Sequence, residues 1–157
     1  MAAKENIDIL LSSDHSMEVS LRSIKNGNAG LNKHRQYLLS KVPASNQWRR
    51  FPRDSITIKD IAYLSARTSH EFALLRSKKE DILFHGMKYH CNISGSLVDL
   101  LKTRYLRLIA HSHPTEHIPI PSVNDRKVLE LIDQKESIII SAVTGKQILF
   151  SSDRFEL

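Results

Sequence analysis

The sequence of 157 residues contains a single cysteine, Cys91, so no disulfide can form within the chain. A lone thiol is typical of a reducing compartment, and we expect a cytoplasmic protein. The scarcity of cysteine also excludes two kinds of zinc protein. These are the Cys-rich zinc modules and the nucleobase deaminases that bind zinc through a Cys-x-x-Cys motif.

Long hydrophobic runs are missing too. No stretch approaches the ~20 apolar residues that a membrane-spanning helix needs. Residues 1–6 lack the apolar core and cleavage site of a signal peptide. With 41% hydrophobic and 25% charged residues, the composition is typical of a globular protein. We therefore expect a soluble protein with one domain and no membrane partner.

Acidic residues are absent from residues 21–53, although this segment carries eight basic ones. They are Arg22, Lys25, Lys33, Arg35, Lys41, Arg49, Arg50 and Arg53. From residue 61 to the end the chain has 13 basic and 11 acidic residues, so the net charge of +6 is unevenly spread. Such an excess could attract nucleic acid, an anionic membrane or an acidic protein, although a solvated basic surface is its commoner meaning.

The pattern of apolar residues predicts an α/β domain over residues 55–157, with helices packed on a mixed β-sheet. Helices are expected over 57–68, 94–105 and 122–134, and strands over 71–76, 81–85, 107–110, 137–142 and 147–151. The helix over 122–134 should bury Val123, Val128, Leu129, Leu131 and Ile132. Ser94 or Ser96 could cap the helix that begins near them.

Residues 1–54 are expected to form a basic, partly helical N-terminal extension of this domain. A short element is expected over 7–11, a helical turn or two over 16–24 and a helix over 31–42. Residues 43–52 are predicted to be a loop.

The segment His111-Ser-His113-Pro114 is the first half of a candidate metal site. Side chains two residues apart on a strand point to the same side, and Pro114 keeps His113 extended. Asp125 lies twelve residues after His113, in the first turn of a helix that Ser122 can cap, so its carboxylate can reach the same point. Two imidazoles and a carboxylate leave the fourth tetrahedral position to water, as in catalytic zinc sites.

Taken singly, these residues have ordinary structural roles. His111 fits a histidine at a strand end, Asp125 complements a helix dipole and Ser122 caps a helix. Their joint occurrence predicts a hydrolase with one Zn²⁺ per chain.

The pattern His111-Ser-His113-Pro, followed by Pro-Ser122-x-x-Asp125, resembles the metal-binding motif of the JAMM/MPN metalloproteases of the prokaryotic type, also called Jab-like or Mov34-like peptidases. The order of elements from about Ser55 onward is similar to that of the family. The resemblance implies a mixed sheet in an α-β-α layering like that of the cytidine deaminases. One residue more separates His113 from Ser122 than is usual in the family.

The resemblance also implies roles for individual residues. His111, His113 and Asp125 would ligate zinc, and Ser122 would donate a hydrogen bond to the oxyanion. The family uses a glutamate on an early strand as general acid/base, and Glu71 is the best match because it opens an otherwise apolar strand.

Three other acidic residues near these elements are weaker candidates for the base. Glu80 and Asp81 lie in or beside the expected hairpin turn and should be solvated. Glu116 lies in a loop, which we expect to be too mobile to hold a base in position.

The reaction that the resemblance implies is hydrolysis of a peptide or isopeptide bond in a protein or peptide, with ubiquitin-like proteins among the candidate substrates. Two other functions stay open. Inactive members of the fold serve as protein-interaction scaffolds. Segment 21–53 could bind nucleic acid, although it has no recognised nucleic-acid motif. The substrate and the oligomeric state are not encoded in any motif that we recognise.

Overall fold

The structure is a computed structural model that describes residues 9–12 and 31–152. The helical turn expected over 16–24 lies outside these residues. In chain order the elements are β1 (Ile9–Ser12), α2 (Lys33–Lys41), β2 (Gln47–Pro52), α3 (Ile58–Thr68), β3 (Phe72–Arg76), β4 (Glu80–His85), β5 (His90–Ile93), α4 (Ser96–Lys102), β6 (Arg107–His113), α5 (Val123–Leu131), β7 (Glu136–Ser141) and β8 (Gln147–Ser151).

The main sheet has six strands in the order β2-β4-β3-β6-β7-β8. All neighbours in it are antiparallel except β6 and β7, which are parallel and align His113 with Ser141. A second, two-stranded sheet pairs β1 with β5. The prediction of an α/β protein with a mixed sheet and helices packed on it is confirmed.

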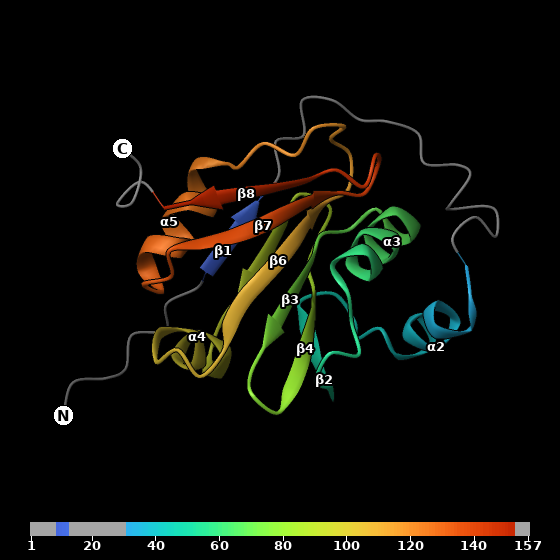
Figure 1. The fold of residues 1–157 in the computed structure, drawn as a ribbon, viewed down its shortest axis with the longest axis horizontal. Helices are drawn as coiled ribbons and strands as arrows, with labels where there is room; N and C mark the ends of the chain where they lie inside the picture. The colour runs from blue at the N-terminus through green and yellow to red at the C-terminus, as the bar shows by residue number, and fades with distance from the viewer. Residues whose placement is uncertain (1–8, 13–30, 153–157) are drawn as a thin grey trace.

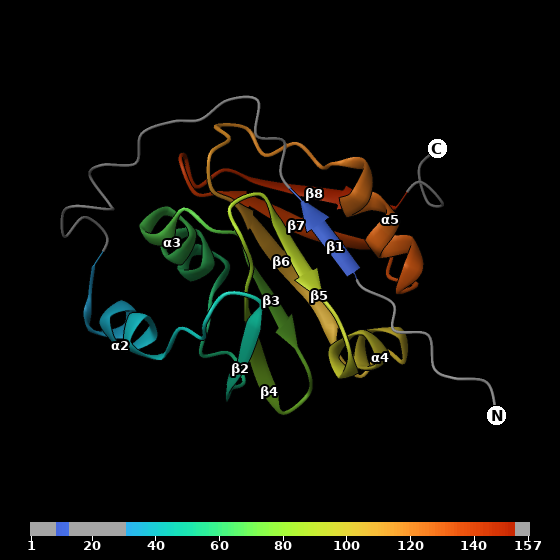
Figure 2. The same ribbon diagram turned by 180° about the vertical axis from the view of Figure 1, so that it is seen from behind.

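Helices and the small sheet cover the main sheet on both faces. α3 and α2 lie on one side of it (Figure 1), where Leu64, Leu74 and Ile140 belong to one hydrophobic core. α4, α5 and the β1–β5 pair lie on the other side (Figure 2), where Leu97, Val128 and other apolar side chains form a second core. The strands between the two cores are buried on both faces, as expected for the middle of a three-layer domain.

Two of the predicted helices, α3 and α5, begin with a complete capping box. The Thr57 hydroxyl accepts a hydrogen bond from the Asp60 backbone N–H, while the Asp60 carboxylate accepts one from the Thr57 N–H. Ser122 and Asp125 make the same pair of bonds at the start of α5. α4 differs, because its N-cap is Gly95 with φ of 66° and no side chain caps it, so neither Ser94 nor Ser96 has the predicted role.

The predicted burial of α5 is partly wrong. Val128, Leu129 and Ile132 are buried, whereas Val123 is 67% and Leu131 40% exposed. Val123 is the first residue of the helix and Leu131 the last, and the helix ends before Ile132 turns back to the core. No helix in the described part of the chain has the length and apolarity to cross a membrane.

The predicted boundary between residues 54 and 55 does not divide the structure. Residues 47–52, expected to be a loop, form the edge strand β2, which pairs with β4 over its whole length. β1 pairs with β5, and Leu11 is fully buried in the second core. The described parts of the N-terminal region therefore belong to the body of the domain.

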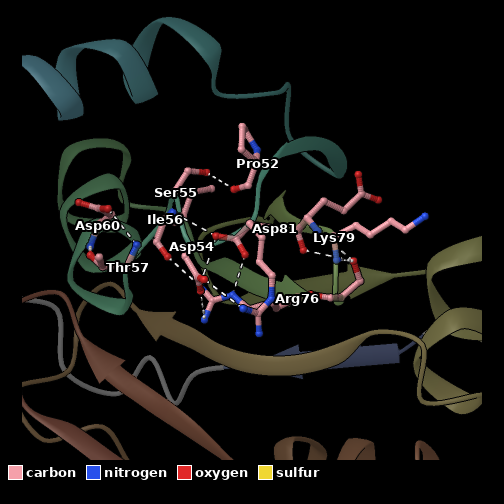
Figure 3. Close-up of polar contacts among 12 residues, drawn as sticks. Pro52, Asp54, Ser55, Ile56, Thr57, Asp60, Arg76, Lys79 and Asp81 are labelled. Atoms are coloured by element: carbon pink, nitrogen blue, oxygen red, sulfur yellow. Dashed lines mark hydrogen bonds and ion pairs between the residues drawn. The ribbon is translucent and has the colours of Figure 1, made fainter.

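The expectation that Asp81 is solvated is also wrong. Its side chain is fully buried next to the start of α3 (Figure 3). The Asp81 carboxylate accepts hydrogen bonds from Arg76 Nε at 2.6 Å and from the Ile56 backbone N–H at 3.1 Å. Arg76, which is partly exposed, also donates to the Ile56 carbonyl oxygen at 3.1 Å, so the buried Asp81 carboxylate has a charged partner that is itself held in place.

Candidate metal centre

Two histidines at the end of β6 form the middle of the candidate site. β6 lies between β3 and β7 and extends through His113, three residues further than the sequence predicts. The side chains of His111 and His113 are fully buried and point to the face that α5 covers. Their Nε2 atoms lie 3.2 Å apart, as the alternation of side chains along a strand predicts.

Asp125 reaches both histidines from the first turn of α5. Its Oδ1 lies 3.3 Å from Nε2 of His111, and its Oδ2 lies 3.4 Å from Nε2 of His113. The end of β6 and the capped start of α5 fix both ends of the loop between His113 and Ser122. Asp125 therefore lies beside the two imidazole rings, although this loop is one residue longer than the motif usually has.

Glu71 lies on the other side of β6 from β7 and immediately precedes β3. It is fully buried, and one ligand atom each from Glu71, His111 and His113 lie within 4.8 Å of one another. Two hydrogen bonds hold the Glu71 backbone. The Glu71 N–H donates to the Met87 carbonyl at 2.7 Å, and the Glu71 carbonyl accepts from the Gly86 N–H at 2.8 Å. These three buried residues could hold a metal ion.

Glycine at position 86 permits this arrangement. A Cβ there would lie 2.6 Å from the Cys91 sulfur and 3.0 Å from the Glu71 carbonyl oxygen, closer than side chains pack. The absence of a side chain therefore lets β5 approach the backbone of Glu71.

The polar atoms of the two histidines and Asp125 lie in direct contact. His111 Nε2 and His113 Nε2 are 3.2 Å apart, and Asp125 approaches them with different oxygens, Oδ1 at 3.3 Å from His111 Nε2 and Oδ2 at 3.4 Å from His113 Nε2. Neutral imidazoles and a carboxylate are also the ligand types that zinc accepts.

Burial and the neighbouring charges shift the pKa values of these three residues in different directions. Burial lowers the pKa of His111, although the Asp125 carboxylate opposes this change. Burial acts in the same direction on His113, but hydrogen bonds with Asp125 and Glu116 and the charge of Glu71 outweigh it and raise its pKa to about 10. Burial alone would raise the pKa of Asp125, but the two histidines lower it. A bound cation would satisfy the same carboxylates.

Ser122 lies next to Asp125, but its hydroxyl already takes part in two contacts. Its Oγ accepts a hydrogen bond from the Asp125 N–H at 3.0 Å and lies 3.0 Å from the Ser12 Oγ. The Ser12 backbone N–H donates to Asp125 Oδ1 at 2.8 Å. Ser12, the last residue of β1, is therefore part of the site, although no motif in the sequence indicated it.

Glu116 differs from its prediction as a mobile loop residue. It is only 6% exposed, and its Oε1 lies 3.2 Å from Nδ1 of His113. The one sign of this contact in the sequence is that Glu116 is an acidic residue three positions after His113, a candidate ligand.

The remaining histidines near the site have other contacts. His70 Nδ1 and His85 Nε2 lie 2.7 Å apart, and His85 Nδ1 lies 2.7 Å from the Pro43 carbonyl oxygen. Cys91 is fully buried, and burial together with the charges of Glu71 and Asp125 raises the pKa of its thiol well above the usual value. A thiol that remains protonated is a poor metal ligand.

Comparison of the chain with protein-family models, with curated proteins and with solved structures found no match in any of the three. The resemblance to the JAMM/MPN metalloproteases therefore depends on the residues of the sequence motif.

Proposed function

We propose that this chain is a zinc-dependent hydrolase of peptide or isopeptide bonds, of the JAMM/MPN type. The observation that carries the proposal is the spacing of His111 Nε2, His113 Nε2 and the Asp125 carboxylate, 3.2 to 3.4 Å, with the buried Glu71 beside them. A cluster of buried polar groups without a ligand would cost free energy that a folded domain rarely tolerates. Binding a cation would offset that cost.

Each residue has a defined task in this mechanism. His111, His113 and Asp125 would hold the zinc ion, which when bound acts as a Lewis acid and lowers the pKa of water to about 7. Glu71 accepts a proton from the attacking water and returns it to the nitrogen of the leaving amine. The Ser122 oxygen keeps its hydrogen bond from the Asp125 N–H, and the Ser122 hydroxyl donates a hydrogen bond to the oxyanion of the carbonyl under attack.

The direct test is to measure zinc and turnover in the same preparations. We expect elemental analysis of protein purified with zinc to find one zinc per chain, and zinc to be lost in His113→Ala. His117→Ala is the matched control, because this histidine is exposed and only its backbone oxygen has a described contact. Hydrolysis is measured on a panel of peptides and ubiquitin-like fusions. Wild-type protein without zinc would refute the proposal.

One observation favours a second candidate, a catalytically silent scaffold with a structural metal. The side chains of His111, His113 and Asp125 are all fully buried, as in closed structural sites. Full zinc occupancy with no turnover on any substrate of the panel would support this candidate. Nucleic-acid binding is less well supported, because Arg35, Arg50 and Arg53 in the basic segment pair with Asp60, Glu80 and Asp54.

A further inference from the structure

A buried carboxylate lies behind one of the two candidate histidine ligands. Glu116 Oε1 is 3.2 Å from Nδ1 of His113, on the opposite edge of the ring from the Nε2 that faces His111 and Asp125. Neither of these two atoms makes a well-aligned hydrogen bond in the described part of the chain, so their contact is the close approach of an ion pair. Because both atoms are buried and within hydrogen-bonding range, each is the available partner of the other.

The loop holds Glu116 in this position. Its Oε2 accepts a hydrogen bond from the Ile120 backbone N–H at 3.1 Å. The carbonyl oxygen of Glu116 accepts a hydrogen bond from the Ser141 hydroxyl, at the end of β7. The Ala142 N–H donates to the His113 carbonyl at 3.0 Å, so the same turn after β7 fixes both the histidine and the glutamate.

The chemistry of such an arrangement is well defined. A histidine that ligates a metal through Nε2 carries its proton on Nδ1, and a carboxylate that accepts this proton fixes the tautomer and the ring orientation. The surroundings of the two candidate ligands differ. Glu116 Oε1 lies 3.2 Å from Nδ1 of His113, whereas among residues 9–12 and 31–152 no carboxylate lies within ion-pair distance of Nδ1 of His111.

We propose that Glu116 is a positioning residue that holds His113 in the Nδ1–H tautomer with Nε2 directed at the metal. This inference rests on the proposed zinc site. The competing explanation is that Glu116 only stabilises its loop through the Ile120 N–H.

Replacement by glutamine separates the two explanations. A glutamine has one carbonyl oxygen, and a Glu116→Gln side chain that keeps this oxygen on the Ile120 N–H must turn its NH₂ group toward His113. The NH₂ group is a donor and favours the His113 tautomer with a proton on Nε2, which cannot bind a metal. A structural role would thus survive the substitution, whereas a positioning role would not.

The experiment measures zinc affinity by competition with a chromophoric chelator in wild type, Glu116→Gln and Glu130→Gln. We expect Glu116→Gln to weaken zinc binding by about 10–100-fold, while the thermal unfolding of its zinc-free form stays near that of wild type. Glu130 is exposed on α5, so Glu130→Gln, which removes the same charge, should leave the affinity unchanged. In zinc-loaded wild type, ¹⁵N NMR of the His113 ring should show a protonated Nδ1.

The possible failures are distinguishable. Wild type that binds no zinc would refute the proposed function and this inference with it. Wild type that binds zinc, with equal affinity in Glu116→Gln or with an unprotonated Nδ1 at His113, would refute the inference alone. If Glu116→Gln does not fold, the ¹H shift of the His113 Nδ1–H in zinc-loaded wild type decides, because a hydrogen bond to the Glu116 carboxylate moves this signal downfield and its absence would refute the inference.

Discussion

Two buried glutamates near His113 have different environments, and these suggest different tasks. Glu71 belongs to the group of ligand atoms that includes both histidines, so it can reach a water molecule at the metal. Glu116 contacts the Nδ1 edge of His113 and bonds the Ile120 N–H, so its carboxylate points away from the reacting atoms. Glu71 is accordingly the candidate base, and Glu116 the candidate support for a ligand.

The role of Glu71 can be tested with an isosteric change. We expect Glu71→Gln to reduce turnover by about 10²–10⁴-fold, because an amide cannot accept the proton from water. Zinc content should stay at the wild-type level, since His111, His113 and Asp125 are unchanged. Glu80→Gln, at the start of β4, is the control and should leave turnover intact. Equal turnover in Glu71→Gln and wild type would remove Glu71 from the mechanism.

At the scale of single residues, the sequence predicted those side-chain positions that depend only on neighbours in the chain. His111 and His113 lie two positions apart at the end of one strand, and Ser122 and Asp125 lie three positions apart in one helical turn, so their relative positions follow from local structure alone. Asp81 is predicted to be solvated because it lies beside a hairpin turn, but the fold brings the Ile56 N–H, 25 residues away in the chain, onto its carboxylate. Glu116 and Ser12 were missed for the same reason, because their contacts depend on how the loop and β1 fold back.

Among the elements, β1 has a direct link to the site. Its last residue, Ser12, donates its backbone N–H to Asp125 Oδ1 and contacts Ser122 through its hydroxyl. Pairing with β5 aligns Ser12 with His90 and Leu11 with Cys91, so the strand is held along its length. β1 therefore helps to fix the carboxylate that faces both histidines.

The contribution of β1 can be divided between backbone and side chain. Ser12→Pro removes the N–H that bonds the Asp125 carboxylate, a bond of the charge-assisted kind, and should destabilise the protein by about 1.5–3 kcal/mol. Ser12→Ala keeps the N–H and loses only the hydroxyl contact, so its effect should be about 1 kcal/mol or less. Urea unfolding of both variants measures the difference. Equal effects would show that the N–H bond to Asp125 contributes nothing.

A second link between elements gives the stability a pH dependence. His85 on β4 donates a hydrogen bond from Nδ1 to the Pro43 carbonyl before β2, which leaves its Nε2 to accept a hydrogen bond from His70 Nδ1. Burial lowers the pKa of His85 below its usual 6.5, and burial together with the charge of His85 lowers that of His70. Both shifts favour the neutral form of the ring in the folded protein.

The direction of this pH dependence follows from the difference in proton binding between the folded and unfolded states. The unfolded chain takes up protons near pH 6.5, before the folded protein does, so this stability is complete above pH 6.5 and is lost as the pH falls through the lowered pKa values. We expect the free energy of unfolding to decrease between pH 6.5 and 5, and to decrease less in His85→Gln. His117→Gln should follow wild type. An equal slope in His85→Gln would contradict the proposed role of His85.

At the element scale, segments with regular apolar spacing were predictable, including the five-residue strands β3 and β8, whereas the strands β2 and β5 were not. α3 agrees with its predicted range, because Thr57 and Asp60 form a capping box and apolar residues recur at helical spacing. β1, β2 and β5 contain four to six residues each, and their pairing partners lie far away in the chain. In β2 the run Gln-Trp-Arg-Arg-Phe-Pro has no regular alternation, so only its place beside β4 makes it a strand.

For the molecule as a whole, metal binding should couple to folding. The candidate ligands come from β6 and α5, and Glu71 approaches them from the residue before β3, so an unfolded chain has no preformed site. At a free zinc concentration 1,000 times the Kd, binding stabilises the folded state by about 4 kcal/mol. For a chain of this size that shift corresponds to a Tm increase of about 8–16 °C.

Removal of zinc by a chelator should therefore lower the Tm of wild type by a similar amount. His113→Ala, which lacks one ligand, should unfold at the same temperature with and without the chelator. A calorimetric scan of the two proteins is sufficient. A wild-type Tm that does not respond to chelator or to added zinc would show that no metal stabilises this fold.

The pairing of β1 with β5 also bears on how the chain acquires its structure during synthesis. Ile9 lies opposite Ile93 and Ser12 opposite His90, so the earliest described strand has its partner about eighty residues later. Asp125, which Ser12 bonds, leaves the ribosome later still. Pairings of such large sequence separation form slowly. The N-terminal strand must stay unpaired until most of the domain has emerged, and we expect it to join the nascent protein near the end of folding.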